Sequence, residues 1–555
     1  MTKVILVGIN ARFIHPNLAI RYLRNYIARQ PYRIVLKEFT INQSRLSIMQ
    51  EIYDENPKII GISVYVWNAE LVHSLLPVLK IILPDVIIVL GGPEVSYTAA
   101  AWLQRHPEVD YIVCGAGEAG FLELAVNNFH LPSRVISKTN PPFPAIPFPY
   151  LEEDFPELTN RFIYYETSRG CPFRCPYCLS AREDQPLEML PLERVKKELA
   201  YLMAKDLRII KFIDRTFNAD PVRARAIWNY IFSVEKASCF HFEIRPELLK
   251  DADIELLGKK TSHAFRLEIG IQSVNLLTRR KIGREKLDSG IVTKMKKLST
   301  LPHIIIHTDL IVGLPHENLD SIKKSFNEVY KMQPRELQLG FLKVLPGSPL
   351  ENYTNKFEIK NNPAPPYEIL QNRWLSFREI CALHAMENLF NYYYNSGKFR
   401  TILENAVNWF ETPFSFYWEF ETFHRAGTES SSNTDWKSRA LLLLNFLMDK
   451  YPGKKDFCMD CLRWDWCLLA VSHYYPPFLR PADEKDLKIT GTAYLKEKIA
   501  ENELFLDEYR QTGKLLNRTI YYRADSSEFR KKYLPGHTLA AFIKIGKKTY
   551  PIMLA

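Results

Sequence analysis

The chain has 555 residues, of which 46% are hydrophobic and 25% are charged, and its net charge is +10. This composition is typical of folded globular protein, and the length predicts about three or four domains rather than one. No apolar run reaches the ~20 residues of a membrane-spanning helix, and no cleavable signal pattern precedes the first predicted strand. The nine cysteines are an odd number, and a chain of this size does not need disulfide bonds to be stable. We therefore expect the protein in the reducing cytoplasm.

Residues 1–140 predict an α/β domain built on a doubly wound parallel sheet. Its buried-strand runs alternate with helical segments; they are Lys3–Gly8, Arg33–Phe39, Ile59–Val66, Val86–Leu90 and Tyr111–Cys114. Because ligands of such sheets bind at the carboxyl ends of the strands, the loops there are candidate binding segments. Their polar residues and glycines are Asn10, Arg12, His15, Ser63, Tyr65, Trp67, Asn68, Gly91, Gly92, Glu94, Gly115, Gly117 and Glu118.

These loops alone do not decide which ligand, if any, the domain binds. The glycines would let the backbone approach a large ligand, but they also suit a purely structural domain or a nucleotide site. No G-x-G-x-x-G follows the first strand, so a dinucleotide site has little support.

Residues 141–160 predict a linker. Five of the ten residues at positions 141–150 are proline, which excludes an α-helix or a central strand and favours an extended, stiff connector. We expect its aromatic residues to pack on a neighbouring domain.

Three cysteines lie close together in the segment Arg169–Cys178, at C-x3-C-x2-C spacing. Cys171, Cys175 and Cys178 can hold three irons of a 4Fe–4S cluster and leave the fourth iron open for another ligand. A zinc site is the alternative, but it needs a fourth ligand and no Cys or His follows closely. This loop, with Tyr177 before its third cysteine, resembles that of radical S-adenosylmethionine (SAM) enzymes, in which SAM chelates the open iron.

An α/β domain directly before such a loop resembles the cobalamin (B12)-binding domain of cobalamin-dependent radical SAM enzymes. The matching segments are Gly61-Ile-Ser-Val-Tyr, Leu90-Gly-Gly-Pro-Glu and Gly115-Ala-Gly-Glu. Many cobalamin domains ligate cobalt with the histidine of D-x-H-x-x-G; around His15, Phe13 replaces the Asp and Leu18 the Gly. Without the carboxylate that would orient the imidazole, we expect His15 to be a contact residue and not a cobalt ligand. Tyr65 and Trp67 are candidates for the lower corrin face.

Strands and helices alternate again in residues 161–360, and the resemblance implies a partial (β/α)6 barrel whose chemistry lies at the carboxyl ends of the strands. The predicted strands are Phe162–Thr167, Ile209–Asp214, Cys239–Ile244, Phe265–Ile271, Ile304–Leu310 and Leu337–Leu345. By resemblance, Glu243 and Arg245 face the SAM ribose and carboxylate, and Ile311–Pro315 lies under its adenine. The remaining residues expected to face SAM or substrate are Asp214, Asn218, Glu268, Gly270, Gln272 and Arg284.

Residues 361–555 predict a mainly helical accessory domain, which resembles the uncharacterised C-terminal domain (DUF4080-like) of one subgroup of these enzymes. We expect helices at Tyr367–Glu387 and Ser438–Tyr451, and short strands from about Thr519. Cys458, Cys461 and Cys467 suggest an auxiliary cluster, with Cys381 as a possible fourth ligand. The alternative, which we favour, is an amphipathic helix in which these cysteines act as small hydrophobic residues.

The resemblance implies a 4Fe–4S cluster, SAM and cobalamin as cofactors, and SAM cleavage to a 5′-deoxyadenosyl radical. The leading hypothesis is a class B-type methyltransferase that acts on an unactivated carbon or phosphorus of a small molecule. The alternatives are a cobalamin-dependent cyclase or rearrangement enzyme, a tRNA- or RNA-modifying enzyme, and a non-catalytic redox or SAM sensor. The positive charge permits an anionic substrate but also serves solubility. An electron donor such as flavodoxin or ferredoxin is the expected protein partner.

Overall fold

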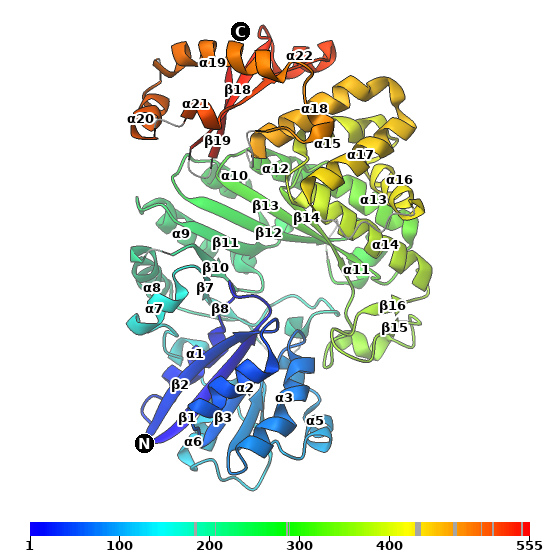
Figure 1. Cartoon of the computed structure of the whole chain (residues 1–555). Helices are drawn as coiled ribbons and strands as arrows, with labels where there is room; N and C mark the ends of the chain where they lie inside the picture. The colour runs from blue at the N-terminus through cyan, green and yellow to red at the C-terminus, as the bar shows by residue number, and fades with distance from the viewer. Residues whose placement is uncertain are drawn as a thin grey trace. The chain divides into compact units, whose positions relative to one another are not determined.

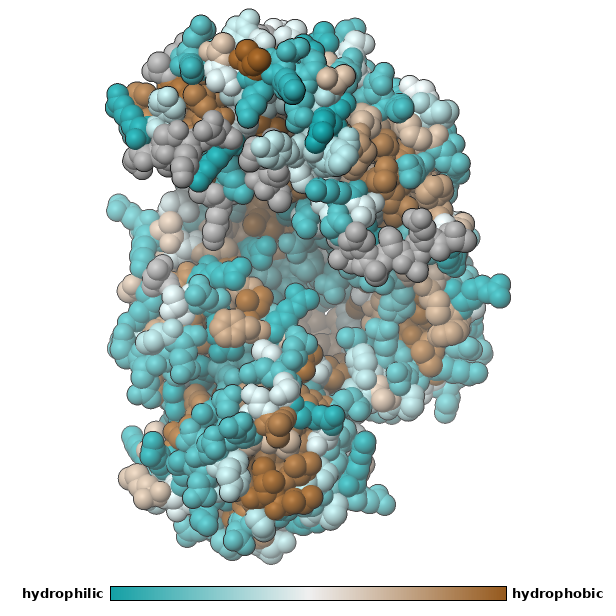
Figure 2. Space-filling model, viewed as in Figure 1, coloured by the Kyte–Doolittle hydropathy of each residue, from teal (hydrophilic) through white to brown (hydrophobic). Residues whose placement is uncertain are grey.

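The computed structural model describes residues 1–181, 186–205, 207–284, 287, 289–427, 435–469, 474–500, 502–512, 515–545 and 548–554. The chain, drawn in Figure 1, divides into two compact units, residues 1–380 and 381–555. On the face drawn in Figure 2, hydrophilic residues cover most of the surface and hydrophobic residues form separate patches. Among the described helices, none combines the length and the hydropathy of a membrane span.

The first unit begins with a six-stranded parallel sheet of order β2-β1-β3-β4-β5-β6, which confirms the predicted doubly wound architecture. The strands are β1 (Thr2–Asn10), β2 (Tyr32–Thr40), β3 (Ile59–Ser63), β4 (Ile87–Gly91), β5 (Tyr111–Cys114) and β6 (Val135–Ser137). β1 is buried along most of its length, as expected for a central strand covered on both faces. Asn17 caps the next helix, because its side chain accepts a hydrogen bond from the Ile20 amide at 3.2 Å.

Two hydrophobic cores cover the two faces of this sheet. One contains side chains of α2 (Arg45–Asp54), α3 (Ala69–Ile82) and α5 (Ala99–Arg105), which pack on Ile5 and Val7. The other contains side chains of α1 (Leu18–Tyr26) and α6 (Gly117–Val126), which pack on Val4 and Leu6. The short helix α4 (Pro93–Ser96) follows β4 directly. All the strand-end loops therefore open at one edge of the sheet.

The proline-rich segment is not extended throughout, because a 3-10 turn forms at Phe143–Ala145 and a short helix, α7, at Phe155–Leu158. Its aromatic residues pack as expected: Phe143 and Tyr150 are buried. The Phe148 ring lies edge-on to Tyr165, with 6.5 Å between the ring centroids.

A second six-stranded parallel sheet follows, of order β14-β13-β12-β11-β10-β7, which confirms the predicted partial barrel. Its strands are β7 (Phe162–Tyr165), β10 (Ile209–Phe212), β11 (Cys239–Ile244), β12 (Ala264–Gln272), β13 (Ile304–Val312) and β14 (Glu336–Phe341). The helices between them are α8 (Leu192–Ala204), α9 (Pro221–Phe232), α10 (Asp251–Leu257), α11 (Leu276–Lys281), α12 (Ser289–Ser299) and α13 (Leu319–Tyr330). Along β12 and β13, fully buried residues alternate with half-buried ones, so one face of the sheet carries the polar side chains.

The expected helix at Tyr367–Glu387 is partly wrong. Its first residues form the strand β16 (Ile369–Gln371), which pairs with β15 (Lys360–Asn361), and the helix α14 begins at Phe377 and ends at Phe390. The Asn372 side chain accepts hydrogen bonds from the Trp374 and Leu375 amides, both at 2.9 Å, and this local turn separates the strand from the helix.

The second unit is mainly helical, as predicted. Its helices are α15 (Arg400–Ala406), α16 (Pro413–Ala426), α17 (Trp436–Lys450), α18 (Lys455–Leu469), α19 (Glu484–Ala500), α20 (Glu503–Thr512), α21 (Leu515–Arg518) and α22 (Ser527–Tyr533). The expected strands near the C-terminus are β17 (Ile520–Arg523), β18 (Leu539–Ile545) and β19 (Lys548–Met553), which form an antiparallel sheet.

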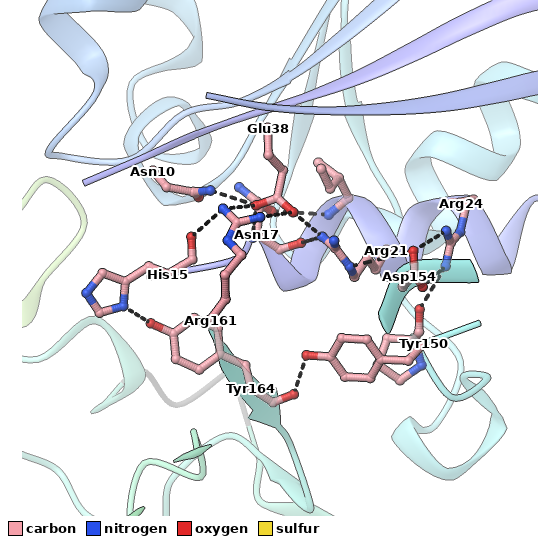
Figure 3. Close-up of polar contacts among 12 residues, drawn as sticks. Asn10, His15, Asn17, Arg21, Arg24, Glu38, Tyr150, Asp154, Arg161 and Tyr164 are labelled. Carbon is pink, nitrogen blue, oxygen red and sulfur yellow. Dashed lines mark hydrogen bonds and ion pairs between the residues drawn. The ribbon is translucent and has the colours of Figure 1, made fainter. Parts of the chain in front are cut away.

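A buried carboxylate joins the first sheet to the second. Figure 3 shows the Glu38 side chain, at the end of β2, surrounded by donors. It accepts a hydrogen bond from the Asn10 side chain at 2.6 Å and ion-pairs with Arg21 at 2.5 Å and Arg161 at 3.3 Å. Arg161 precedes β7 and also donates to the Phe13 carbonyl at 2.7 Å. The clamp therefore holds the loop after β1 against the first barrel strand.

Replacing Glu38 by Ala should destabilise the first unit by about 3–5 kcal/mol, because two buried guanidinium groups lose their shared carboxylate. The measurement is the free energy of unfolding from chemical denaturation. The matched control is Glu55→Ala: Glu55 pairs with Lys3 and Lys37 at a site where its side chain is 25% exposed. That pair should contribute less than about 1 kcal/mol. Equal losses in the two variants would contradict the clamp.

Candidate active site

The cysteine loop lies in the segment between β8 (Ser168–Arg169) and β9 (Glu188–Met189), which form a short antiparallel pair. Cys175 is buried, and Cys171 and Cys178 are half-buried. The Cys178 amide donates to the Cys175 carbonyl at 3.0 Å, which makes a turn between these two cysteines. In the described part of the chain, no three Cys, His, Asp or Glu side chains meet as a ready metal site. The three thiols fit a 4Fe–4S cluster, because they are three in number and lie on one short loop. Their sulfur atoms would come together when a cluster is assembled on them.

Asp214 anchors the start of this loop. Its carboxylate accepts hydrogen bonds from the Thr167 amide at 3.2 Å, from the Thr167 hydroxyl at 2.7 Å and from the Ser168 hydroxyl. Burial raises the pKa of Asp214 to about 6. These three hydrogen bonds hold Thr167 and Ser168, just before the cysteine loop, so Asp214 acts as a positioning residue. Asn218 is likewise engaged, since its side chain bonds both the amide and the carbonyl of Arg245, each at 2.9 Å.

Buried polar atoms without a hydrogen-bond partner gather at the carboxyl ends of β11 and β12. Within the described residues, Arg245 Nε and Nη1, Gln272 Oε1 and Arg284 Nε make no hydrogen bond, although Arg245 Nε lies at ion-pair distance, 3.7 Å, from Glu247 Oε2. The Arg245 guanidinium lies 3.8 Å from the centre of the Phe173 ring, so it reaches the cysteine loop. Because unpaired buried polar groups cost about 1–3 kcal/mol each, this cluster favours a polar ligand that would satisfy them.

Gln272 adds backbone strain to the same place. Its φ is +67°, and the pairing of β12 with β13 shifts register between Gly270 and Gln272. A Cβ added at Gly270 would lie only 2.3 Å from Nε2 of the Gln272 side chain, so any residue larger than glycine would clash there. The Gly270 carbonyl accepts from Arg284 Nη1 at 2.9 Å. Strain of this kind persists where the surrounding structure enforces it, often at a functional site.

Glu268, inside the barrel, is in contrast held by two partners. Glu268 Oε2 lies 2.8 Å from His241 Nε2 and 3.3 Å from Lys211 Nζ. Burial opposes its ionisation, but these partners hold the pKa of Glu268 at about 2. Burial and the Glu268 charge raise the pKa of Glu243 to about 7. Glu243 is thus the carboxyl of this group best suited to exchange a proton near neutral pH.

One cavity of about 930 Å³ joins the strand-end loops of the first sheet to the cysteine loop. Of the residues expected for cobalamin, the cluster or SAM, its lining includes Asn10, His15, Ser63, Tyr65, Trp67, Gly91, Gly92, Glu94, Gly115, Gly117, Glu118, Tyr177, Cys178 and Glu243. Cys171, Cys175, Asp214, Arg245, Glu268, Gln272 and Arg284 do not line it. Its size and its glycine-lined wall fit a large cofactor.

The aromatic residues of this cavity have fixed orientations. The Tyr65 and Trp67 rings are stacked, 4.3 Å apart and 7° from parallel. Trp67 donates to the Ile9 carbonyl at 3.1 Å. His15 Nδ1 lies 2.6 Å from the Tyr164 hydroxyl (Figure 3), and burial lowers the pKa of His15. The imidazole is therefore neutral and anchored by a hydroxyl rather than by a carboxylate.

Two carboxylates of the first sheet bind residues from beyond it. Glu118 pairs with Arg169 at 2.9 Å, immediately before the cysteine loop, and Arg169 also pairs with Glu166 at 2.9 Å. The buried Glu94 accepts a hydrogen bond from the Tyr367 hydroxyl. Both carboxylates therefore connect the cavity wall to other parts of the first unit.

Sequence reasoning missed Glu247 as a member of this cluster. Glu247 Oε2 is buried, makes no hydrogen bond among the described residues, and lies 3.7 Å from Arg245 Nε. Glu247 Oε1 lies 2.5 Å from the buried Arg279. The one signal available was the Arg-Pro-Glu run, which places Glu247 two residues after Arg245.

The distal cysteines lie on α18, which confirms the favoured helix. Cys458, Cys461 and Cys467 are fully buried, whereas Cys381 is exposed. Burial raises the pKa of Cys458 and of Cys467 to about 12, so both are protonated thiols at neutral pH. They pack as small apolar residues.

Three family models match the chain. Residues 4–125 match the B12 binding domain, residues 165–329 the Radical SAM superfamily, and residues 355–532 a protein family of unknown function, DUF4080. The chain is therefore a radical SAM protein with an N-terminal B12 binding domain and a DUF4080 region.

Its curated relatives include two methyltransferases. The cobalamin-dependent radical SAM methyltransferase TokK of Streptomyces tokunonensis is 26% identical over 64% of this chain and 57% of its own length. The 2-(S-pantetheinyl)-carbapenam-3-carboxylate methyltransferase of Streptantibioticus cattleyicolor is 25% identical over 63% of this chain and 56% of its own length. The chain thus spans little more than half the length of these relatives.

Solved structures share the fold. The cobalamin-dependent SAM radical enzyme OxsB with aqua-cobalamin bound has a TM-score of 0.58 at 16% identity, over 84% of this chain and 80% of that one. The radical SAM methyltransferase TsrM from Kitasatospora setae, with cobalamin and a [4Fe-4S] cluster bound, has a TM-score of 0.54 at 14% identity, over 66% and 79%.

Replacing Asp214 by Ala should lower the iron that the chain retains after anaerobic reconstitution. The Thr167 and Ser168 donors lose their acceptor, at about 1–3 kcal/mol for each buried group, and the loop start loosens. Asp214→Asn keeps one acceptor oxygen and should retain most of the iron. The measurement is iron per folded chain; full iron in Asp214→Ala would exclude the positioning role.

Proposed function

We propose that the chain is a cobalamin-dependent radical SAM enzyme that transfers a methyl group to an unactivated carbon or phosphorus of a small molecule. The single observation that carries this proposal is the shared cavity. Its wall combines the strand-end loops of a B12 binding domain with Tyr177 and Cys178 of the cysteine loop. A cofactor bound to the first sheet would therefore lie beside SAM bound at the second.

Each cofactor has a separate set of proposed contacts. Cys171, Cys175 and Cys178 would hold a 4Fe–4S cluster, and the glycine loops with Tyr65 and Trp67 would hold cobalamin. The unpaired atoms of Arg245, Gln272 and Arg284 would bind SAM, with an arginine pairing its carboxylate by two hydrogen bonds.

When bound, the cluster would supply one electron for SAM cleavage and cobalamin would carry the methyl group. The protein's own part is orientation and exclusion of water. The Glu38–Arg161 clamp and the Arg169–Glu118 ion pair hold the two sheets around one cavity, so that reacting groups meet at short distance. Glu243, with a pKa of about 7, lines the cavity and is placed to take a proton if the methylated centre must lose one.

The methyltransferase assignment rests on the relatives, both of which are named methyltransferases. Rearrangement remains the alternative, since the name of OxsB states only that it is a radical enzyme. We also propose that the substrate is a small molecule and that a donor protein supplies the electron.

Metal content tests the cofactor assignment. Anaerobically reconstituted, desalted protein should contain about one cobalt and about four irons per chain. The variant with Cys171, Cys175 and Cys178 changed to Ala should lose the iron but keep the cobalt. The matched variant with Cys458, Cys461 and Cys467 changed to Ala should keep both. Iron without cobalt in the unaltered protein would remove cobalamin from the mechanism.

Product stoichiometry tests the reaction class. With substrate and reductant, a methyltransferase should release S-adenosylhomocysteine and 5′-deoxyadenosine in about equal amounts, because two SAM molecules are consumed per turnover. A rearrangement would release 5′-deoxyadenosine without stoichiometric S-adenosylhomocysteine. The Cys175→Ala variant should form no 5′-deoxyadenosine. Chromatography of the quenched reaction measures both products.

A further inference from the structure

A second cavity, of about 810 Å³, lies on the other side of the cysteine loop. Arg174 and Pro176 of the loop line it, whereas Tyr177 and Cys178 line the first cavity. The Pro176 carbonyl accepts from the Leu350 amide at 2.8 Å. A Cβ at Gly283, whose φ is +69°, would lie 3.4 Å from the Arg174 carbonyl oxygen. The loop backbone is thus fixed as a wall between the two cavities.

The lining of this second cavity is basic and aromatic. Arg174, Arg280 and Lys281 are exposed side chains. The Lys281 ammonium lies 5.6 Å from the centre of the Tyr353 ring and 5.4 Å from that of Phe357, which fixes its position by cation–π contacts.

Among the described lining residues, Glu351 is the only acidic one, and its carboxylate accepts from the Gly347 amide at 2.7 Å. Exposed cations around aromatic side chains are the composition of a surface that attracts an acidic protein.

We propose that this cavity is the docking surface for an acidic one-electron carrier protein. The inference rests on the proposed function, which requires an electron at the cysteine loop. The first cavity is assigned to cobalamin, so we expect a donor protein to approach from the second cavity, where Arg174 is exposed and Pro176 is half-buried. One electron passes from the carrier, which is oxidised by one electron, to the cluster site, which is reduced by one. No bond forms or breaks in this step.

Binding tests the surface without reference to turnover. The probe is a purified flavodoxin, titrated anaerobically against the reconstituted full chain at low and at physiological salt. Arg280→Glu with Lys281→Glu should weaken binding at low salt by about tenfold or more and flatten its salt dependence. The matched control is Lys296→Glu with Lys297→Glu, an exposed adjacent pair on α12 that lines neither cavity. It should change binding by less than about twofold.

Turnover separates this inference from the proposed function. With titanium(III) citrate as reductant, the Arg280/Lys281 variant should cleave SAM at the unaltered rate, and with reduced flavodoxin about tenfold more slowly. If the unaltered chain fails with titanium(III), the proposed function is wrong, and the binding titration still decides the surface.

Three outcomes would overturn the docking surface. The first is unaltered flavodoxin binding by the Arg280/Lys281 variant. The second is an equal loss in the Lys296/Lys297 control. The third is inorganic phosphate competing better than chloride at equal ionic strength, which would make the cavity a small-anion site. If the charge reversal fails to fold, Arg280→Gln with Lys281→Gln is titrated in its place, with about half the effect on a logarithmic scale.

Discussion

The burial of one carboxylate, Glu38, constrains how the two parallel sheets of the first unit meet. A charge with a side chain only 9% exposed must be neutralised, and Arg21 and Arg161 do so together with the Asn10 amide. Since Arg161 directly precedes β7, the pairing fixes the loop after β1 against the barrel strand that leads to the cysteine loop.

Paired and unpaired polar groups divide the barrel into a scaffold and a candidate site. Inside it, Glu268 is satisfied by His241 and Lys211, so this layer needs no ligand to be stable. At the strand ends, Arg245 and Gln272 keep buried atoms without partners among the described residues, and Gln272 has a strained backbone. Backbone strain and unsatisfied buried polar groups of this kind are often found at functional sites.

The second unit illustrates why cysteine spacing alone is ambiguous. Cys458, Cys461 and Cys467 have a spacing that a cluster loop might use, yet they lie on one continuous helix and are buried. A helix keeps these thiols on its surface at fixed separations, and burial keeps the pKa of each thiol high. The Cys171–Cys178 segment has instead the glycine and proline that a wrapping loop requires, with Gly170 at a φ of +85°.

The sequence by itself determined both parallel sheets, the cysteine loop and the strand-end loops of the cavity wall, because strand periodicity and strand-end glycines are local signals. It failed where a local turn outweighed periodicity, as at Ile369–Gln371, and it did not find Glu247 as a member of the unpaired cluster. Only the tertiary structure decided that Asp214 anchors the loop, that Glu268 is paired inside the barrel, and that two cavities flank the cysteine loop. Those facts depend on contacts between residues far apart in sequence, whose partners no local pattern specifies.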